Sequence, residues 1–72
     1  MTGDEIRKTR FREALRGYHP RDVDRFLEEI AQALDNGTSA TALFADVTFR
    51  DKLRGYRRED VDQLLDRIRR AV

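Results

Sequence analysis

The chain has 72 residues and a formal net charge of +1, and 40% of its residues are charged. A chain this short buries only about 60% of the surface that its unfolded form exposes, so we expect one small domain or two half-domains. It has no cysteine and a single histidine, His19, so we expect no disulfide, no metal site and no cofactor. The small net charge excludes a strong pull of the whole molecule on nucleic acid or membrane.

The N-terminal residues give no sign of export or of membrane insertion. No apolar run approaches the ~20 residues that span a bilayer, and the first residues lack the apolar core of a signal peptide. We therefore expect a cytoplasmic location. Residues 2–5 resemble a helix capping box, Thr2 followed by Glu5, which predicts a short helical turn through Lys8 anchored by Ile6 and Phe11. The alternative is a frayed terminus held by Phe11 alone.

The sequence Leu-Arg-Gly-Tyr at residues 15–18 forms a basic corner. Gly17 predicts a tight bend with a positive φ, at a place where a Cβ atom would clash. Tyr18 predicts a packing residue whose hydroxyl bonds to a backbone group.

A helix is predicted to follow the corner. Pro20 suits the first helical position, His19 stands where the N-cap belongs, and Asp22 and Asp24 favour the positive end of the helix dipole. Asn36-Gly37 is typical of a helix C-cap. The apolar residues recur with helical period at Val23, Phe26, Leu27, Ile30, Ala33 and Leu34.

The second half of the chain repeats the first. Leu-Arg-Gly-Tyr recurs at residues 53–56, 38 residues later, and 12 of 24 positions are identical when residues 11–34 are aligned without a gap on residues 49–72. A repeat dictates the architecture, so we divide the chain into a first repeat (1–36), a linker (37–41) and a second repeat (42–72). In the second repeat we expect a helical turn at 42–45, an extended segment at 47–49, and a helix opened by residues 57–60. Its apolar stripe is Val61, Leu64, Leu65, Ile68, Ala71 and Val72.

Nothing in the sequence supports an enzyme. The repeated acid pairs, Asp22 with Asp24 and Asp60 with Asp62, are explained by helix N-termini, and no nucleophile–base pair or phosphate-binding glycine loop is present. Each corner instead forms a basic patch with one leucine. Such a patch suits an anionic membrane or a protein partner, and nucleic-acid phosphates are the alternative. The candidate contact residues are Leu15, Arg16, Leu53, Arg54, Arg12 and Arg50, and the residues that shape the corners are Gly17, Tyr18, Gly55 and Tyr56.

These residues together resemble the N-terminal domain of the DivIVA family, bacterial scaffolds of cell division and polar growth. The resemblance rests on Thr2, Glu5, Ile6 and Phe11, on Leu-Arg-Gly-Tyr at 15–18 and on Val-Asp-Arg-Phe-Leu at 23–27. A shorter set recurs at Phe49, 53–56 and 61–65.

The resemblance implies a peripheral membrane scaffold at the inner face of the plasma membrane, at the pole or septum. It also implies an aromatic residue beside an arginine that contacts lipid, and a long coiled coil that makes the family dimeric. This chain departs from that pattern at three places. It has Leu15 and Leu53 in place of the aromatic residue, His19 and Arg57 in place of an acidic cap, and a first helix that ends at Asn36-Gly37.

We therefore predict an all-α fold of two repeats, paired within one chain as a pseudo-dimer or between chains as a homodimer. The expected function is a scaffold or interaction module that binds a protein partner or itself, with an anionic membrane as a further contact. The alternatives are nucleic-acid binding and oligomerisation alone. The expected helix–helix interface comprises Val23, Phe26, Leu27, Ile30, Leu34, Val61, Leu64, Leu65 and Ile68.

Overall fold

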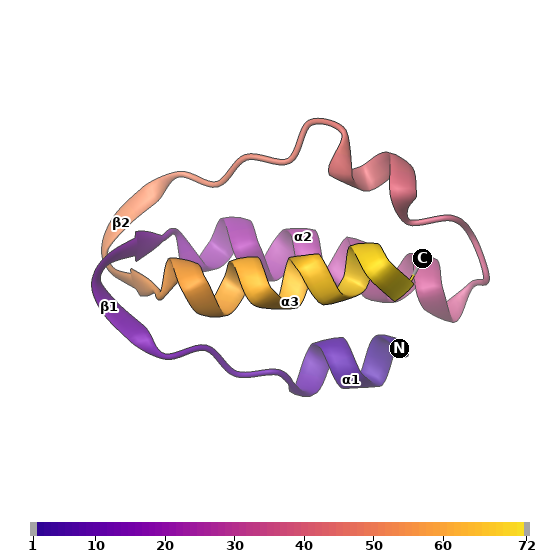
Figure 1. Ribbon diagram of the computed structural model, residues 1–72, viewed down its shortest axis with the longest axis horizontal. Helices are drawn as coiled ribbons and strands as arrows, with labels where there is room; N and C mark the ends of the chain where they lie inside the picture. Colours follow the sequence, from indigo (N-terminus) through magenta and orange to yellow (C-terminus); the bar gives the residue numbers. More distant parts are fainter. Residues whose placement is uncertain (1, 72) are drawn as a thin grey trace.

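The computed structural model describes residues 2–71 (Figure 1). The elements in chain order are α1 (Gly3–Lys8), β1 (Glu13–Tyr18), α2 (Pro20–Asp35), the 3₁₀ helix η1 (Thr41–Phe44), β2 (Asp51–Tyr56) and α3 (Arg58–Ala71). The molecule measures 36 × 23 × 19 Å. Both long helices begin at the strand end and run side by side toward the other end, where α1 begins and α3 ends (Figure 1).

The predicted helix boundaries are confirmed in the first half of the chain. The Thr2 hydroxyl accepts the Glu5 N–H at 3.3 Å and caps α1, and His19 Nδ1 accepts the Arg21 N–H at 3.3 Å and caps α2. At the other end of α2 the N–H groups of Gly37 and Thr38 donate to the carbonyls of Leu34 and Ala33, at 3.2 and 2.9 Å. This is the Schellman arrangement, and Gly37 adopts the left-handed φ of 70° that it requires.

The all-α expectation is wrong at the two corners, which form a two-stranded sheet. Partner numbers fall from Tyr56 to Asp51 as β1 runs from Glu13 to Tyr18, so the strands are antiparallel. The ladder extends beyond the strands, because His19 N–H donates to the Arg50 carbonyl and Arg57 N–H donates to the Arg12 carbonyl. Each corner is extended only because the other corner supplies its partner, and no short-range pattern in the sequence encodes that.

The two corner glycines allow the strands to cross. A Cβ atom on Gly17 would run into the carbonyl oxygen of Tyr56, and one on Gly55 would run into that of Tyr18. The predicted clash is therefore confirmed. The predicted positive φ at Gly17 is wrong, since the described residues with positive φ are Gly37 and Arg54. Close approach of two backbones, and not a left-handed bend, is what requires glycine here.

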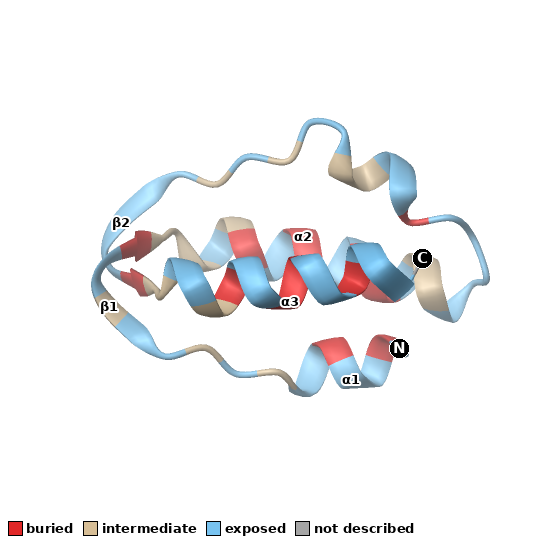
Figure 2. Ribbon diagram, in the orientation of Figure 1, coloured by how far each residue is buried: buried red, intermediate tan, exposed pale blue. Residues whose placement is uncertain are grey.

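One apolar core lies between the two halves of the chain (Figure 2). The predicted stripe residues of α2 and α3 supply most of it, and Val23, Ile30, Val61 and Ile68 are fully buried. Leu34 is half-buried, while Ala31 and Ala40 are buried although they lie off the predicted stripes. The core consists of Ile6, Val23, Phe26, Leu27, Ile30, Ala31, Ala40, Val61, Leu64, Leu65 and Ile68.

The short N-terminal turns flank this core. Arg7 fastens α1 to α2, because its guanidinium donates to both carboxylate oxygens of Glu28 at 3.2 Å and to Asp35 at 2.8 Å. In the second half the turn predicted at 42–45 is the 3₁₀ helix η1. The rings of Phe44 in η1 and Phe26 in α2 meet edge-on, with their centroids 5.4 Å apart. The guanidinium of Arg69 lies over the Phe44 ring.

Candidate functional site

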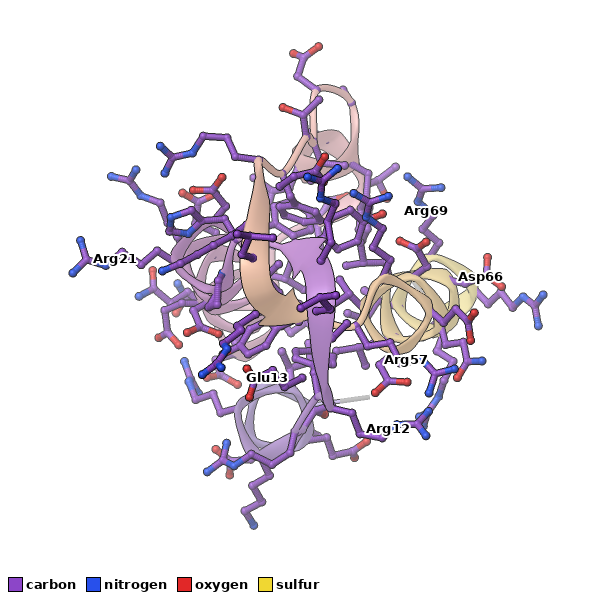
Figure 3. The ribbon with its side chains drawn as sticks, turned by 90° about the vertical axis from the view of Figure 1, so that its left-hand side faces the viewer. Arg12, Glu13, Arg21, Arg57, Asp66 and Arg69 are labelled. Carbon is purple, nitrogen blue, oxygen red and sulfur yellow. The ribbon has the colours of Figure 1, made fainter. Side chains whose placement is uncertain are left out.

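The candidate site is the end of the molecule formed by residues 13–18 and 51–56, which we call the tip. Figure 3 looks onto it, with the crossed strands in front and the long helices to either side. Leu15 and Leu53 are 80% and 63% exposed and are the exposed large hydrophobic residues of the described chain. Both leucines therefore point outward and contribute nothing to the core. The fold brings together two residues that are 38 positions apart in sequence.

Cations surround the two leucines. Arg16, Lys52 and Arg54 are exposed on the strands, and within residues 2–71 no salt bridge engages any of the three. Asp51, an acid of the tip, is already paired with Arg58. The tip also carries the exposed acid Glu13, so it combines two exposed leucines with an excess of positive charge.

Two arginine–aspartate clasps hold the tip to the helices. Asp60 accepts from the backbone N–H, Nε and Nη2 of Arg12 at 3.0, 3.1 and 2.9 Å. Asp22 accepts hydrogen bonds from the backbone N–H, Nε and Nη2 of Arg50 at 3.0, 3.0 and 2.9 Å. The two clasps are related by the 38-residue offset of the repeats, and each joins a residue of one repeat to a helix of the other. A carboxylate that accepts a bidentate guanidinium is among the stronger polar pairs in proteins.

The clasps perturb the acids. Hydrogen bonds from Arg12 hold the pKa of Asp60 at about 2, below the ordinary value of 3.8. Hydrogen bonds from Arg50 lower the pKa of Asp22 in the same way. The cause in both cases is donation to the charged form of the carboxyl, which stabilises it.

A second pair of contacts repeats the same two-fold relation. The Tyr18 hydroxyl donates to Asp62 at 2.8 Å, and the Tyr56 hydroxyl donates to Asp24 at 2.9 Å. Desolvation by burial, together with these acids, raises the pKa of both tyrosines. The tyrosines also pack on the phenylalanine of the other repeat, Tyr18 on Phe49 and Tyr56 on Phe11, with ring centroids 5.1 and 5.0 Å apart.

The predicted packing role of Tyr18 is confirmed, but the backbone partner expected for its hydroxyl is wrong. Its partner is a carboxylate on the far repeat. The helix dipole alone does not account for the acid pairs, whose role as acceptors was not predicted. One sequence signal could have indicated these ion pairs. The arginine at 12 recurs at 50 and the aspartate at 22 recurs at 60, so both partners of the contact are repeated.

The structure sorts the predicted contact residues into two groups. Leu15, Arg16, Leu53 and Arg54 lie together on the tip. Arg12 and Arg50 lie beside it with their guanidinium groups bound in the clasps. Their predicted contact with lipid or a partner stays a prediction. No cluster of residues in the described chain could hold a metal ion, and none of its helices has the length and apolarity to cross a bilayer.

Comparison with known proteins settles the family. The family model described as DivIVA protein matches residues 1–42, more than half of the chain, and covers α1, β1 and α2. The chain belongs to the DivIVA family. Proteins of this family are non-enzymatic scaffolds, and membership suggests a role in cell division or polar growth. No curated protein and no solved structure matches the chain. Strand β2 and helix α3 lie beyond the matched DivIVA segment.

Proposed function

We propose that this DivIVA-family chain is a scaffold module of bacterial cell division or polar growth whose tip binds anionic membrane. The observation that carries the proposal is the exposure of Leu15 and Leu53 on two paired strands that also carry three cations without an ion-pair partner. Both leucines lie on the same pair of strands as these cations, so apolar and positive groups occupy one end of the molecule, as a surface for anionic lipid requires.

The energies are sufficient for reversible binding. Burial of one leucine side chain contributes about 2 kcal/mol, and each cation near an anionic leaflet contributes about 1 kcal/mol. Two leucines and the cations Arg16, Lys52 and Arg54 therefore supply several kcal/mol when they act on one surface. Because the crossed strands fix both corners in one tip, the second corner binds without a new loss of translational freedom.

The second half of the chain is best understood as a second DivIVA-like unit, so that one chain holds a pseudo-dimer. The clasps, the tyrosine–aspartate bonds and the aromatic pairs all occur twice with the same offset. The helix of each repeat also accepts the arginine of the other. A single chain can then present the paired corners without a long coiled coil.

The membrane proposal is tested by co-sedimentation with vesicles that contain anionic phospholipid. Leu15→Glu and Leu53→Glu each place an acid on the tip, and we expect each to reduce binding at least tenfold while helicity is retained. Ala42→Glu is the matched control, because Ala42 is exposed on η1 and the same charge is added away from the strands. Equal binding by all four proteins would overturn the membrane proposal.

The same set of variants separates the alternative readings. If the basic tip binds nucleic-acid phosphates, a DNA mobility shift should weaken with Arg16→Ala and Arg54→Ala and hardly respond to Leu15→Ala. If neither vesicles nor DNA bind, the chain acts through protein contacts alone. The exposed leucines favour the membrane.

A further inference from the structure

The two clasps and the two tyrosine–aspartate bonds all join one repeat to the other. Arg12 and Tyr18 reach aspartates of α3, and Arg50 and Tyr56 reach aspartates of α2. The two strands of the sheet also come from different repeats. Each contact would be equally well formed if the two repeats belonged to different copies of the chain.

Only one exposed stretch ties the repeats covalently. Residues 36–39 are exposed, and their hydrogen bonds are local. The N–H groups of Gly37 and Thr38 and the Thr38 hydroxyl donate to the last turn of α2, and the Ser39 hydroxyl accepts the Thr41 N–H. We call residues 36–39 the hinge. Opening the hinge breaks only these few exposed bonds. Separating the repeats also breaks the clasps, the sheet and the shared core, and all of these can form again between copies.

We infer that two copies of this chain exchange repeats, so that the first repeat of one copy closes on the second repeat of the other. The exchanged dimer recovers all clasps, the sheet and the core, and it differs from the monomer only at the hinge. Exchange of this kind is a low-cost route to dimers and is governed by concentration. The product carries two tips on one particle. This inference does not depend on lipid, since its readout is molecular mass.

A charge exchange at one clasp tests the inference directly. Arg12→Asp and Asp60→Arg are made in separate full-length chains, and each places like charges in its own clasp. When the two variants are mixed, unfolded and refolded together, an exchanged heterodimer pairs an arginine with an aspartate at both of its clasps of this kind, once in the native order and once reversed. We expect the mixture to form heterodimer in preference to either homodimer or monomer, as seen by native mass spectrometry. The Arg50–Asp22 clasp remains intact throughout and serves as the internal control.

Wild-type protein provides a second arm that does not rely on destabilised variants. After refolding at millimolar concentration we expect a dimer peak by size exclusion with light scattering, and after refolding at low micromolar concentration a monomer. The double variant Asn36→Ala with Gly37→Ala removes the turn that stops α2, so the hinge becomes helical and the dimer fraction should rise severalfold. A wild-type protein and hinge variant that stay monomeric at millimolar concentration, or a refolded mixture without heterodimer, overturn the inference.

Discussion

Arg54 adopts a φ of 58°, a left-handed conformation that a residue with a Cβ rarely takes. Arg16 occupies the same place in the first repeat and is not in that region. The two corners are therefore alike in sequence and different in backbone. The difference falls next to Gly55, one of the two glycines at which the strands cross, so one of the two corners absorbs the bend. A left-handed residue of this kind costs about 1–2 kcal/mol.

Substituting glycine for Arg54 and, separately, for Arg16 should distinguish the effect of backbone strain on stability from the effect of added chain flexibility. Arg54→Gly removes the strain and also adds freedom to the unfolded chain, whereas Arg16→Gly adds that freedom alone. We expect the free energy of unfolding of Arg54→Gly to exceed that of Arg16→Gly by about 1 kcal/mol. Urea denaturation followed by circular dichroism measures both. Equal values for the two variants would mean that Arg54 is not strained.

Helices α2 and α3 do more than bury an apolar stripe. Each carries, in its first two turns, the aspartates that accept the arginine and the tyrosine of the opposite repeat. The helix N-terminus already favours a negative charge there, and the guanidinium adds a directed partner. The first two turns of each helix therefore bind the strand region of the opposite repeat.

Acid should loosen these fastenings. The folded pKa values of Asp22 and Asp60 lie below their unfolded values, so the clasps contribute stability above an unfolded pKa of about 4. That stability is lost as pH falls through the folded pKa, about 2 for Asp60. We expect the free energy of unfolding to decrease between about pH 5 and pH 2.

The control for this pH dependence is a pair of variants. The double variant Asp22→Asn with Asp60→Asn should be less stable at neutral pH and should show a shallower loss in acid. Asp46→Asn alters an exposed carboxylate outside the clasps and should keep the wild-type slope. Parallel slopes for wild type and the double variant would show that the clasps do not set the acid response.

As a whole, the molecule has a single core shared by both repeats. Neither repeat encloses its own apolar stripe, because Val23 and Ile30 from one half and Val61 and Ile68 from the other are fully buried in the same cluster. A chain of 72 residues has little surplus stability, and it cannot lose one half and keep the other.

The shared core predicts a single cooperative unfolding transition. Val23→Ala and Val61→Ala remove the same methyl groups at equivalent, fully buried positions. Each should lower the free energy of unfolding by about 2 kcal/mol. Circular dichroism of the helices and tyrosine fluorescence at the strand end should report coincident transitions in both variants. Separate transitions, with one variant shifting only one of them, would show that the repeats fold independently.

Local patterns in the sequence predicted the helices well. The apolar spacing from Val23 to Ile30 and from Val61 to Ile68 placed the buried faces, and Thr2, His19 and Asn36-Gly37 marked the helix ends. These features depend on residues within a few positions of one another, so the sequence carries them directly. The internal repeat and the DivIVA resemblance are likewise legible in the order of the residues alone.

The character of the tip depends on long-range contacts. The corners became strands, the tyrosines and arginines found aspartates of the opposite repeat, and Leu15 and Leu53 turned outward. All of these depend on two segments that are 38 residues apart crossing at Gly17 and Gly55. Short-range sequence patterns are enough to tell which residues form helices and which form corners. Which segment each corner pairs with depends on long-range contacts, namely the close crossing of the two backbones and the burial of one common core.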